Sequence, residues 1–279
     1  MIKMKFDLIV VNGDSFSDGG GVREQFIFEN QKEPNVFKIG WASFLSEKLN
    51  IPIINLAVGG TSNKSIINKT LRFLENDTFF YHRDCSYPII SNFNLKNYNN
   101  ILLITQWSFF HRFPVYVKNE YSEITPNMYC GFKENLNDDS LFEKYKEYFD
   151  LKFGIIDNEQ FVARNFVTEY FLYNSYLSNK KNVTHYNWLF VPFEFGPSRF
   201  NFLSFKEKVK SFPFKLINND DIRTDDLKTV AEETNSKIDD SHYGLHSCKI
   251  MADRFVDYLI KEHEEYINNI DDNTDIDKL

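Results

Sequence analysis

The stretch that decides the fold is "LIVVNGDSFSDGGG", Leu8 to Gly21. Its first half is an apolar run that fits a buried strand, and its second half is a small polar loop around Ser15. A structural turn needs only a Gly, Asn or Asp where the backbone turns, so the pair Asp14-Ser15 is more than turning requires. This excess suggests that the loop carries chemistry.

Apolar runs and helical periodicity alternate through the rest of the first half. Because the three apolar runs are apolar throughout rather than alternating, they predict a parallel sheet covered on both faces, and the fold class α/β. Ser62 or Asn63 is expected to cap the second helix, with its inner face at Ile66, Ile67, Thr70, Leu71 and Leu74. The predicted strands are Lys5–Val11, Ile51–Val58 and Asn99–Thr105. The first predicted helix carries Trp41, Phe44, Leu45 and Leu49, and the second follows its cap at Ser62 or Asn63.

Regular structure is predicted again in the second half, after a looser stretch at 112–157 that we interpret as an insertion or cap. Its aromatic side chains are expected to pack a lid onto the core. Residues 1–266 are predicted to form one domain, and the polar segment 267–279 is expected to be a disordered tail. The further predicted elements are a helix over Glu159–Ser178, strands at Tyr186–Phe193 and Phe214–Ile217, and a last helix from near Tyr243.

The sequence argues against binding to nucleic acid and against a membrane-spanning segment. The 279 residues carry a formal net charge of -8 with a pI near 5.3, and no basic patch stands out, which argues against binding to nucleic acid phosphates. The first apolar run is too short for a signal peptide or a membrane span. Unless a leader has been removed, this predicts a protein of the cytoplasm or of a virion. Cys85, Cys130 and Cys248 lack metal-ligand spacing and are expected to be reduced thiols, and no metal or cofactor is predicted.

A reactive serine needs a base, and the base needs an orienting group. Such a pair occurs in "KIDDSHYGLHSCKIMA" (237–252), where Asp239 stands three residues before His242, with Asp240 as the alternative acid. His246 would lie about one turn into the last helix and is interpreted as a partly buried helix residue. The remaining histidines, interpreted as packing or surface residues, are His82, His111, His185 and His263.

The tetrahedral intermediate of acyl transfer also needs hydrogen-bond donors for its oxyanion. Gly59 and Gly60, just past the second predicted strand, let the backbone come close and expose its N–H groups, although they would equally suit a tight turn. In a doubly wound sheet the loops that follow the strands lie together at the carboxyl edge. Three distant loops thus supply a nucleophile, an oxyanion donor and an acid-base pair.

These blocks resemble those of the SGNH hydrolases, the superfamily of GDSL-type esterases and lipases. "GDSFSD" (13–18) is similar to the first block, "NLAVGG" (55–60) to the second and "DDSHYGLH" (239–246) to the last. The resemblance implies that Ser15 is the nucleophile and that its own N–H and Gly60 serve the oxyanion. It also implies that Asp239 orients the base His242. The fold it implies is a three-layer α/β/α sandwich with a mainly parallel, flavodoxin-like sheet.

The third block departs from the family, which has Gly-x-Asn-Asp after the third strand, with the asparagine as a third oxyanion donor. Here the stretch is "LITQWSFFHRF" (103–113), which contains no asparagine. Ser108, or failing that Gln106, is the candidate replacement. The Gly-x-Ser-x-Gly elbow of the α/β-hydrolases is absent, which argues against that fold.

The sequence therefore predicts a serine esterase that needs no metal and cleaves a short acyl group, such as acetate, from a small molecule or glycan by way of an acyl-enzyme. Two alternatives remain open: a non-catalytic binding or structural module that kept the fold, and an O-acyltransferase.

Overall fold

The computed structural model describes residues 6–19, 40–75, 94–108, 112–117, 120–124, 147, 159–189, 211–212, 214–217 and 245–271. The predicted acid-base residues Asp239, Asp240 and His242 lie outside these ranges.

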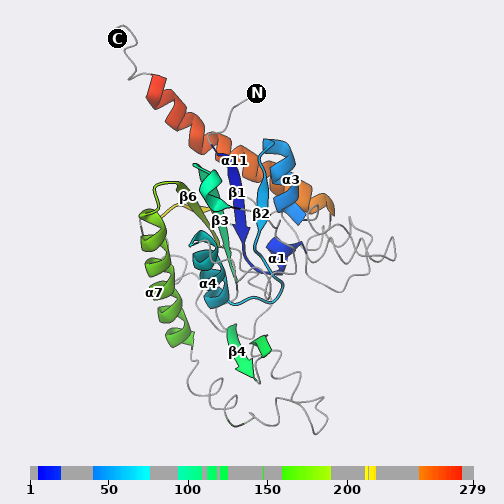
Figure 1. Cartoon of the computed structure of the whole chain (residues 1–279), viewed down its shortest axis with the longest axis vertical. Helices are drawn as coiled ribbons and strands as arrows, with labels where there is room; N and C mark the ends of the chain where they lie inside the picture. The colour runs from blue at the N-terminus through cyan, green and yellow to red at the C-terminus, as the bar shows by residue number, and fades with distance from the viewer. Residues whose placement is uncertain are drawn as a thin grey trace.

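A five-stranded sheet forms the centre of the fold (Figure 1). Its order is β2-β1-β3-β6-β7, and every pair of neighbouring strands is parallel. This is the order of flavodoxin-like folds, so the predicted α/β class and sheet type are confirmed. The strands are β1 (Leu8–Asn12), β2 (Ile53–Asn55), β3 (Ile101–Trp107), β6 (Val183–Leu189) and β7 (Leu216–Ile217).

Helices cover both faces of the sheet, as the unbroken apolar runs predicted. In β1, Ile9 and Val11 point into one core and Leu8 and Val10 into the other, because successive side chains of a strand alternate between faces. The first core is closed by α3 (Gly40–Leu49) and α11 (Leu245–Asp271), and the second by α4 (Asn63–Leu74) and α7 (Glu159–Ser178) (Figure 1). The result is the three-layer sandwich.

Aromatic packing joins α3 and α11 to the sheet. The Trp41 ring stacks on Phe255 at 4.3 Å between centroids and meets Trp188 of β6 edge-on at 5.5 Å. All three side chains are fully buried, and large aromatic groups of this kind contribute much of the apolar area that a core removes from water. An ion pair between Lys48 and Asp253 ties the same two helices at the surface.

The buried face of α4 differs from the predicted one. Its buried side chains centre on Ile66, Thr70 and Phe73, whereas Ile67 and the two leucines of the predicted face are only partly buried. The helix is rotated toward Asn12 of β1, whose amide donates hydrogen bonds to the Ile66 carbonyl and the Thr70 hydroxyl. The orientation of α4 thus follows its buried hydrogen bonds to Asn12 rather than the apolar spacing alone. Ser62 is the N-cap, one of the two predicted candidates.

Several boundaries also differ by two residues or more, and those of β6 and α11 are examples. Strand β6 begins at Val183, three residues before the predicted start, and α11 continues to Asp271, into the segment predicted to be a tail. Tyr266, Ile267 and Ile270 extend the apolar spacing of α11, and adding residues to an existing helix costs little compared with starting one.

The predicted insertion contains an antiparallel pair of strands, β4 (Phe113–Val117) and β5 (Glu120–Ile124). β4 lies against α4, beyond the carboxyl edge of the main sheet (Figure 1). The side chains of the five aromatic residues expected to pack a lid are outside the described part of the chain: Phe109, Phe110, Phe113, Tyr116 and Tyr121.

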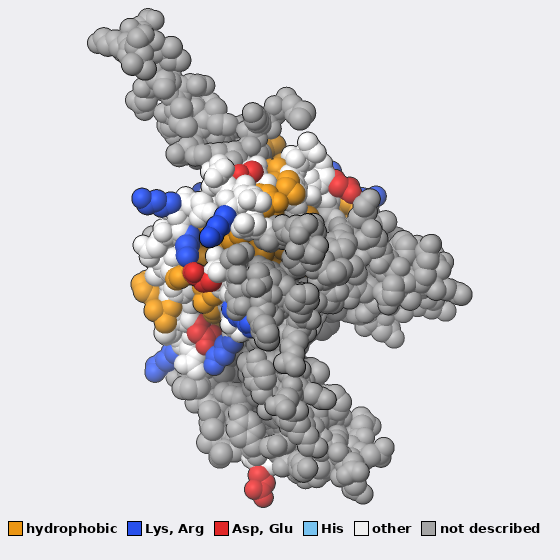
Figure 2. All heavy atoms as spheres, viewed as in Figure 1, with side chains coloured by type: hydrophobic (Ala, Val, Ile, Leu, Met, Phe, Trp, Pro, Cys, Tyr) orange, Lys and Arg blue, Asp and Glu red, His pale blue; other side chains and the backbone are white. Residues whose placement is uncertain are grey.

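The surface in Figure 2 shows basic and acidic side chains interspersed over its described part. Among the helices that the structure describes, none combines the length and apolar character needed to cross a membrane.

Candidate active site

The loop around Ser15 lies at the point of the sheet where ligands of doubly wound folds bind. β1 has β2 on one side and β3 on the other, so the connections that leave the carboxyl ends of these strands diverge there. Asn12, the last residue of β1, is completely buried and anchors this point. Its side-chain oxygen accepts from the Gly13 N–H at 2.9 Å, and its amide nitrogen holds α4.

Ser15 is the first residue of α1 (Ser15–Asp18), a single helical turn. Asp14 caps this turn, because its Oδ1 accepts from the Phe16 N–H at 3.1 Å. Gly19 ends it in the left-handed region with φ 84. From residue 12 to residue 19 every residue is buried except Ser15, which is partly exposed. Ser15 is therefore the one residue of this turn whose surface is partly accessible.

The Asp14 carboxylate is a centre of convergent hydrogen bonds, and its side chain is 1% exposed. Besides the Phe16 N–H, Oδ1 accepts from Nε2 of Gln106 at 2.6 Å. Oδ2 accepts from Oγ of Ser108 at 2.8 Å and from Nη1 of Arg112 at 3.2 Å. Buried carboxylates are stable only when such partners replace water, so this network is a condition for the charge to be there.

The structure brings both candidates from the third block beside the Ser15 turn, but their polar groups face Asp14. Ser108 has one hydroxyl proton, which it donates to Asp14, while its oxygen accepts from Arg112 at 2.9 Å. Gln106 donates to Asp14 and accepts from the Ser17 hydroxyl at 2.5 Å. The oxyanion role of Ser108 and Gln106 stays a prediction, and in the structure both side chains support the turn that carries Ser15.

The loop after β2 packs directly against Ser15. The Asn55 side chain donates to the Ser17 carbonyl at 2.7 Å, and the Val58 N–H donates to the Gly13 carbonyl at 3.3 Å. These bonds bring Gly59 so close that a Cβ atom on it would lie 3.6 Å from the Cβ of Ser15. Gly60 has φ 79, which disfavours any other residue, and no atom of the described part of the chain lies within 4 Å of where its Cβ would stand.

Two backbone donors near the turn are available for an oxyanion. Among the described residues, neither the Ser15 N–H nor the Gly60 N–H donates a hydrogen bond. The first belongs to the start of a helix, where N–H groups have no partner within the helix.

The predicted base and acid belong to a segment outside the described residues, which holds Asp239, Asp240 and His242. His246 is the second residue of α11, with its side chain outside the described set. The roles of all four residues therefore stay predictions.

His185, interpreted from the sequence as a packing or surface residue, is held in β6. Its Nε2 is 2.9 Å from Oγ1 of Thr105, which in turn is 3.0 Å from the Tyr173 hydroxyl. Burial lowers the pKa of His185 to about 3, because the protein interior disfavours the charged imidazolium. Burial in the same cluster raises the pKa of Tyr173 to about 12.

Sequence reasoning missed Arg112 and Asn63. Asn63 holds the Ser108 backbone from both sides, accepting from its N–H at 2.7 Å and donating to its carbonyl at 3.1 Å. The available signal for Arg112 is its position four residues after Ser108, at the start of the predicted insertion. Within the described ranges, no group of three His, Cys, Asp or Glu side chains is arranged to hold a metal ion.

Some solved structures of known proteins are similar to this chain over most of its length. No family model and no curated protein sequence matches. The solved structures similar to this chain include a psychrotrophic esterase, EstA, from Pseudoalteromonas sp., inhibited by monoethylphosphonate, with TM-score 0.42 and 15% identity over 94% of this chain and 99% of that one. A putative GDSL-like lipase from Parabacteroides merdae has TM-score 0.40 and 12% identity, with 90% and 94% covered.

A putative lipolytic protein of the G-D-S-L family from Desulfitobacterium hafniense has TM-score 0.38 and 10% identity, with 89% and 97% covered. The sheet order and the Gly-Asp-Ser turn directly after β1 are features of this chain's own structure. On these features the chain has the SGNH-like α/β fold that its sequence blocks predicted.

Proposed function

We propose that the chain is a serine hydrolase that cleaves short acyl esters, such as acetyl groups on a small molecule or carbohydrate. Ser15 is the nucleophile, His242 takes its proton and later returns it to the leaving group, and Asp239 orients His242. Water then releases the acyl group from Ser15.

The observation that carries this proposal is the setting of Ser15. Ser15 is the partly exposed residue of an otherwise buried turn at the carboxyl edge of the sheet. Because the turn is capped at Asp14 and closed at Gly19, the hydroxyl has a defined position before any substrate arrives. Holding a reacting group in place in this way removes part of the entropic cost of the reaction.

Oxyanion stabilisation is assigned to the backbone. The N–H groups of Ser15 and Gly60 have no acceptor within the described residues. The first belongs to the turn after β1, and the second belongs to the loop after β2, which packs against Ser15. A missing side-chain donor lowers the rate by about a hundredfold, or about 3 kcal/mol of transition-state stabilisation. We therefore expect a slow esterase rather than an inactive one.

The test is a pair of measurements on the whole chain: labelling by a fluorophosphonate probe and release of p-nitrophenol from p-nitrophenyl acetate. Wild type is expected to show both, and Ser15→Ala neither. Ser178→Ala is the matched control, because Ser178 is an exposed serine at the end of α7, shortly before β6 begins at the amino edge of the sheet. Equal labelling of wild type and Ser15→Ala would refute the proposal.

A non-catalytic module is the second candidate, favoured by one observation. The side-chain donors at the end of β3 are engaged with Asp14 rather than directed to a substrate. A wild-type chain that folds but neither labels nor hydrolyses would decide for this candidate.

A further inference from the structure

A buried negative charge lies next to the proposed nucleophile. Asp14 precedes Ser15 in the chain, and its carboxylate is almost completely excluded from water. Attack by Ser15 builds negative charge on the substrate oxygen, and an uncompensated carboxylate at the neighbouring residue would oppose that charge in a medium of low dielectric constant.

Arg112 compensates this charge. Its Nη1 forms an ion pair with Oδ2 of Asp14 at 3.2 Å and also donates to Oγ of Ser108 at 2.9 Å. Its side chain is 14% exposed, so the pair is shielded from solvent and salt far better than an ion pair on the surface. The single Ser108 hydroxyl links the two charged groups, because it donates to Asp14 and accepts from Arg112.

We propose that Arg112 is a positioning residue for Ser15, which acts through Asp14 by fixing the cap of α1 and cancelling its charge beside the reacting hydroxyl. This inference rests on the proposed function for its catalytic meaning. It also accounts for the third block: Gln106, Ser108 and Arg112 form one set of donors whose common acceptor is Asp14.

The test replaces the nucleophile by a thiol, so that it needs no hydrolase activity. In Ser15→Cys, the rate of alkylation by iodoacetamide is measured against pH, with mass spectrometry to locate the label at residue 15. The apparent pKa of the thiol reports the charge around residue 15, because the thiolate is the reactive form. Asp14 is the preceding residue and pairs with Arg112, and a Cβ on Gly59 would lie 3.6 Å from the Cβ of Ser15 and 3.9 Å from Oδ2 of Asp18. Asp18 is unchanged in every variant.

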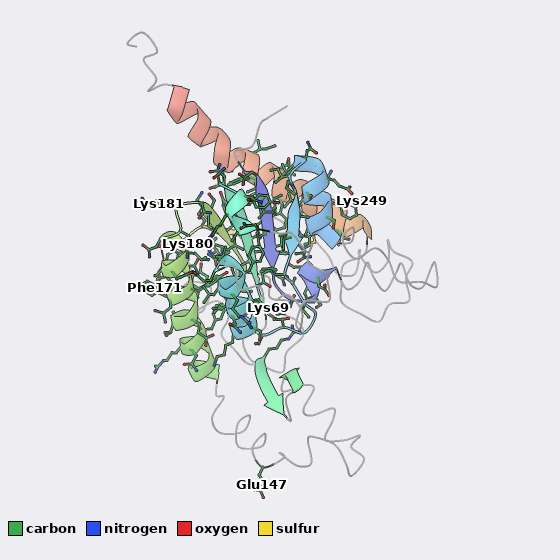
Figure 3. All side chains as sticks on the ribbon, viewed as in Figure 1. Lys69, Glu147, Phe171, Lys180, Lys181 and Lys249 are labelled. Atoms are coloured by element: carbon green, nitrogen blue, oxygen red, sulfur yellow. The ribbon has the colours of Figure 1, made fainter. Side chains whose placement is uncertain are left out.

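Adding Arg112→Gln to this background is expected to raise the pKa of the introduced thiol by about one unit, which lowers the alkylation rate at neutral pH about tenfold. Arg112→Lys should restore most of the rate, because it keeps the charge. Lys180→Gln is the matched control: it also removes one positive charge, but Lys180 pairs with Glu75 at the far end of α7 (Figure 3). An unchanged pKa in Arg112→Gln, or an equal rise in Lys180→Gln, would overturn the inference.

A double-variant comparison shows whether Arg112 acts through Asp14. In the Asp14→Asn background the direct Coulomb effect of Arg112 on the thiol remains, but the part that passes through the Asp14 carboxylate is lost. The rise in thiol pKa caused by Arg112→Gln should therefore be smaller than in the parent background. Additive effects would contradict the linkage. If Arg112→Gln fails to fold by circular dichroism, Asp14→Asn alone should lower the thiol pKa, and the double variant, in which both charges are gone, should return it toward the parent value. A double variant with a pKa as low as that of Asp14→Asn would overturn the inference.

With Ser15 in place, Arg112→Gln is expected to lower kcat for p-nitrophenyl acetate about tenfold and to change KM little, since the charge it compensates matters most in the transition state. A variant with lowered melting temperature and unchanged kcat would mean a merely structural role. If wild type has no esterase activity, the proposed function fails, while the thiol measurement in the Ser15→Cys background still decides the role of Arg112.

Discussion

The side chain of Gln106 fills the space beside Gly13: a Cβ atom on Gly13 would lie 2.7 Å from Oε1 and 2.8 Å from Cβ of Gln106. The start of the turn that carries Ser15 and the end of β3 are therefore packed against each other with no room for a methyl group.

Gly13→Ala is predicted to destabilise the fold by about 1–3 kcal/mol, the usual cost of forcing an extra carbon into a packed core. The measurement is the free energy of unfolding in urea. Because Gln106 must move, its bonds to Asp14 and Ser17 should weaken as well, and labelling of Ser15 by a fluorophosphonate should slow. Unfolding free energy equal to wild type would contradict this close packing.

Gly59→Ala is predicted to separate stability from reactivity. Its new Cβ would stand 3.6 Å from the Cβ of Ser15, an ordinary contact, so the unfolding free energy should stay within about 1 kcal/mol of wild type. The methyl group nevertheless occupies space beside the reacting hydroxyl, and the labelling rate of Ser15 should fall. A labelling rate equal to that of wild type would show that substrate approaches Ser15 from another side.

Gly60→Ala tests the backbone donor. With φ 79, alanine at this position costs about 1–2 kcal/mol, measured as a loss of unfolding free energy. No atom of the described residues crowds the new methyl group, so conformational strain is the expected cause. A turn that relaxes to relieve this strain would also move the N–H proposed for the oxyanion, so kcat should fall by more than in Gly59→Ala. The opposite ranking of the two variants would move the oxyanion role from Gly60 to Gly59.

The assignment of the base predicts a difference between two histidines four residues apart. His242→Ala should lose activity toward p-nitrophenyl acetate to the level of Ser15→Ala, a fall of at least about a thousandfold, because a triad works as a unit. His246→Ala should retain most of the activity. Asp239→Asn is expected to be far more damaging than Asp240→Asn. Equal loss from both histidine variants would mean that the base is wrongly assigned.

The sheet was predictable from sequence because its strands are apolar on both faces. Both faces must therefore be covered by helices, and this is the arrangement of a parallel sheet in an α/β fold. The positions of Ser15 and the two glycines followed, since loops after parallel strands share one edge. The rotation of α4 was not predictable from apolar spacing, because it is decided by the buried bonds of Asn12.

The interactions around Asp14 were the main feature that sequence reasoning missed. Residues 14, 106, 108 and 112 come from the ends of β1 and β3 and from the segment beyond, and only the neighbouring position of those strands in the sheet brings them together. From the sequence, Gln106 and Ser108 are candidate donors to the oxyanion. In the structure both side chains donate to the Asp14 carboxylate, which belongs to the first block.

His185 predicts how the stability of the fold depends on pH. Its pKa is about 3 in the folded chain, below the ordinary value of 6.5 that applies after unfolding. Between these values the unfolded chain binds the extra proton, so the contribution of His185 is fully present above about pH 6.5 and is lost as the pH falls toward 3. One such group changes the unfolding free energy by at most about 1.4 kcal/mol per pH unit.

The corresponding experiment compares urea unfolding at pH 7 and pH 5 for wild type and His185→Gln. The glutamine keeps a polar group near Thr105 but does not titrate, so the variant should lose less stability than wild type on acidification. His263→Gln is the matched control, since His263 is predicted to lie among glutamates on a helix face and should leave the pH dependence unchanged. If acidification destabilised wild type and His185→Gln by the same amount, His185 would have to be accessible to protons in the folded chain, and the burial of the Thr105–Tyr173 cluster would not hold in solution.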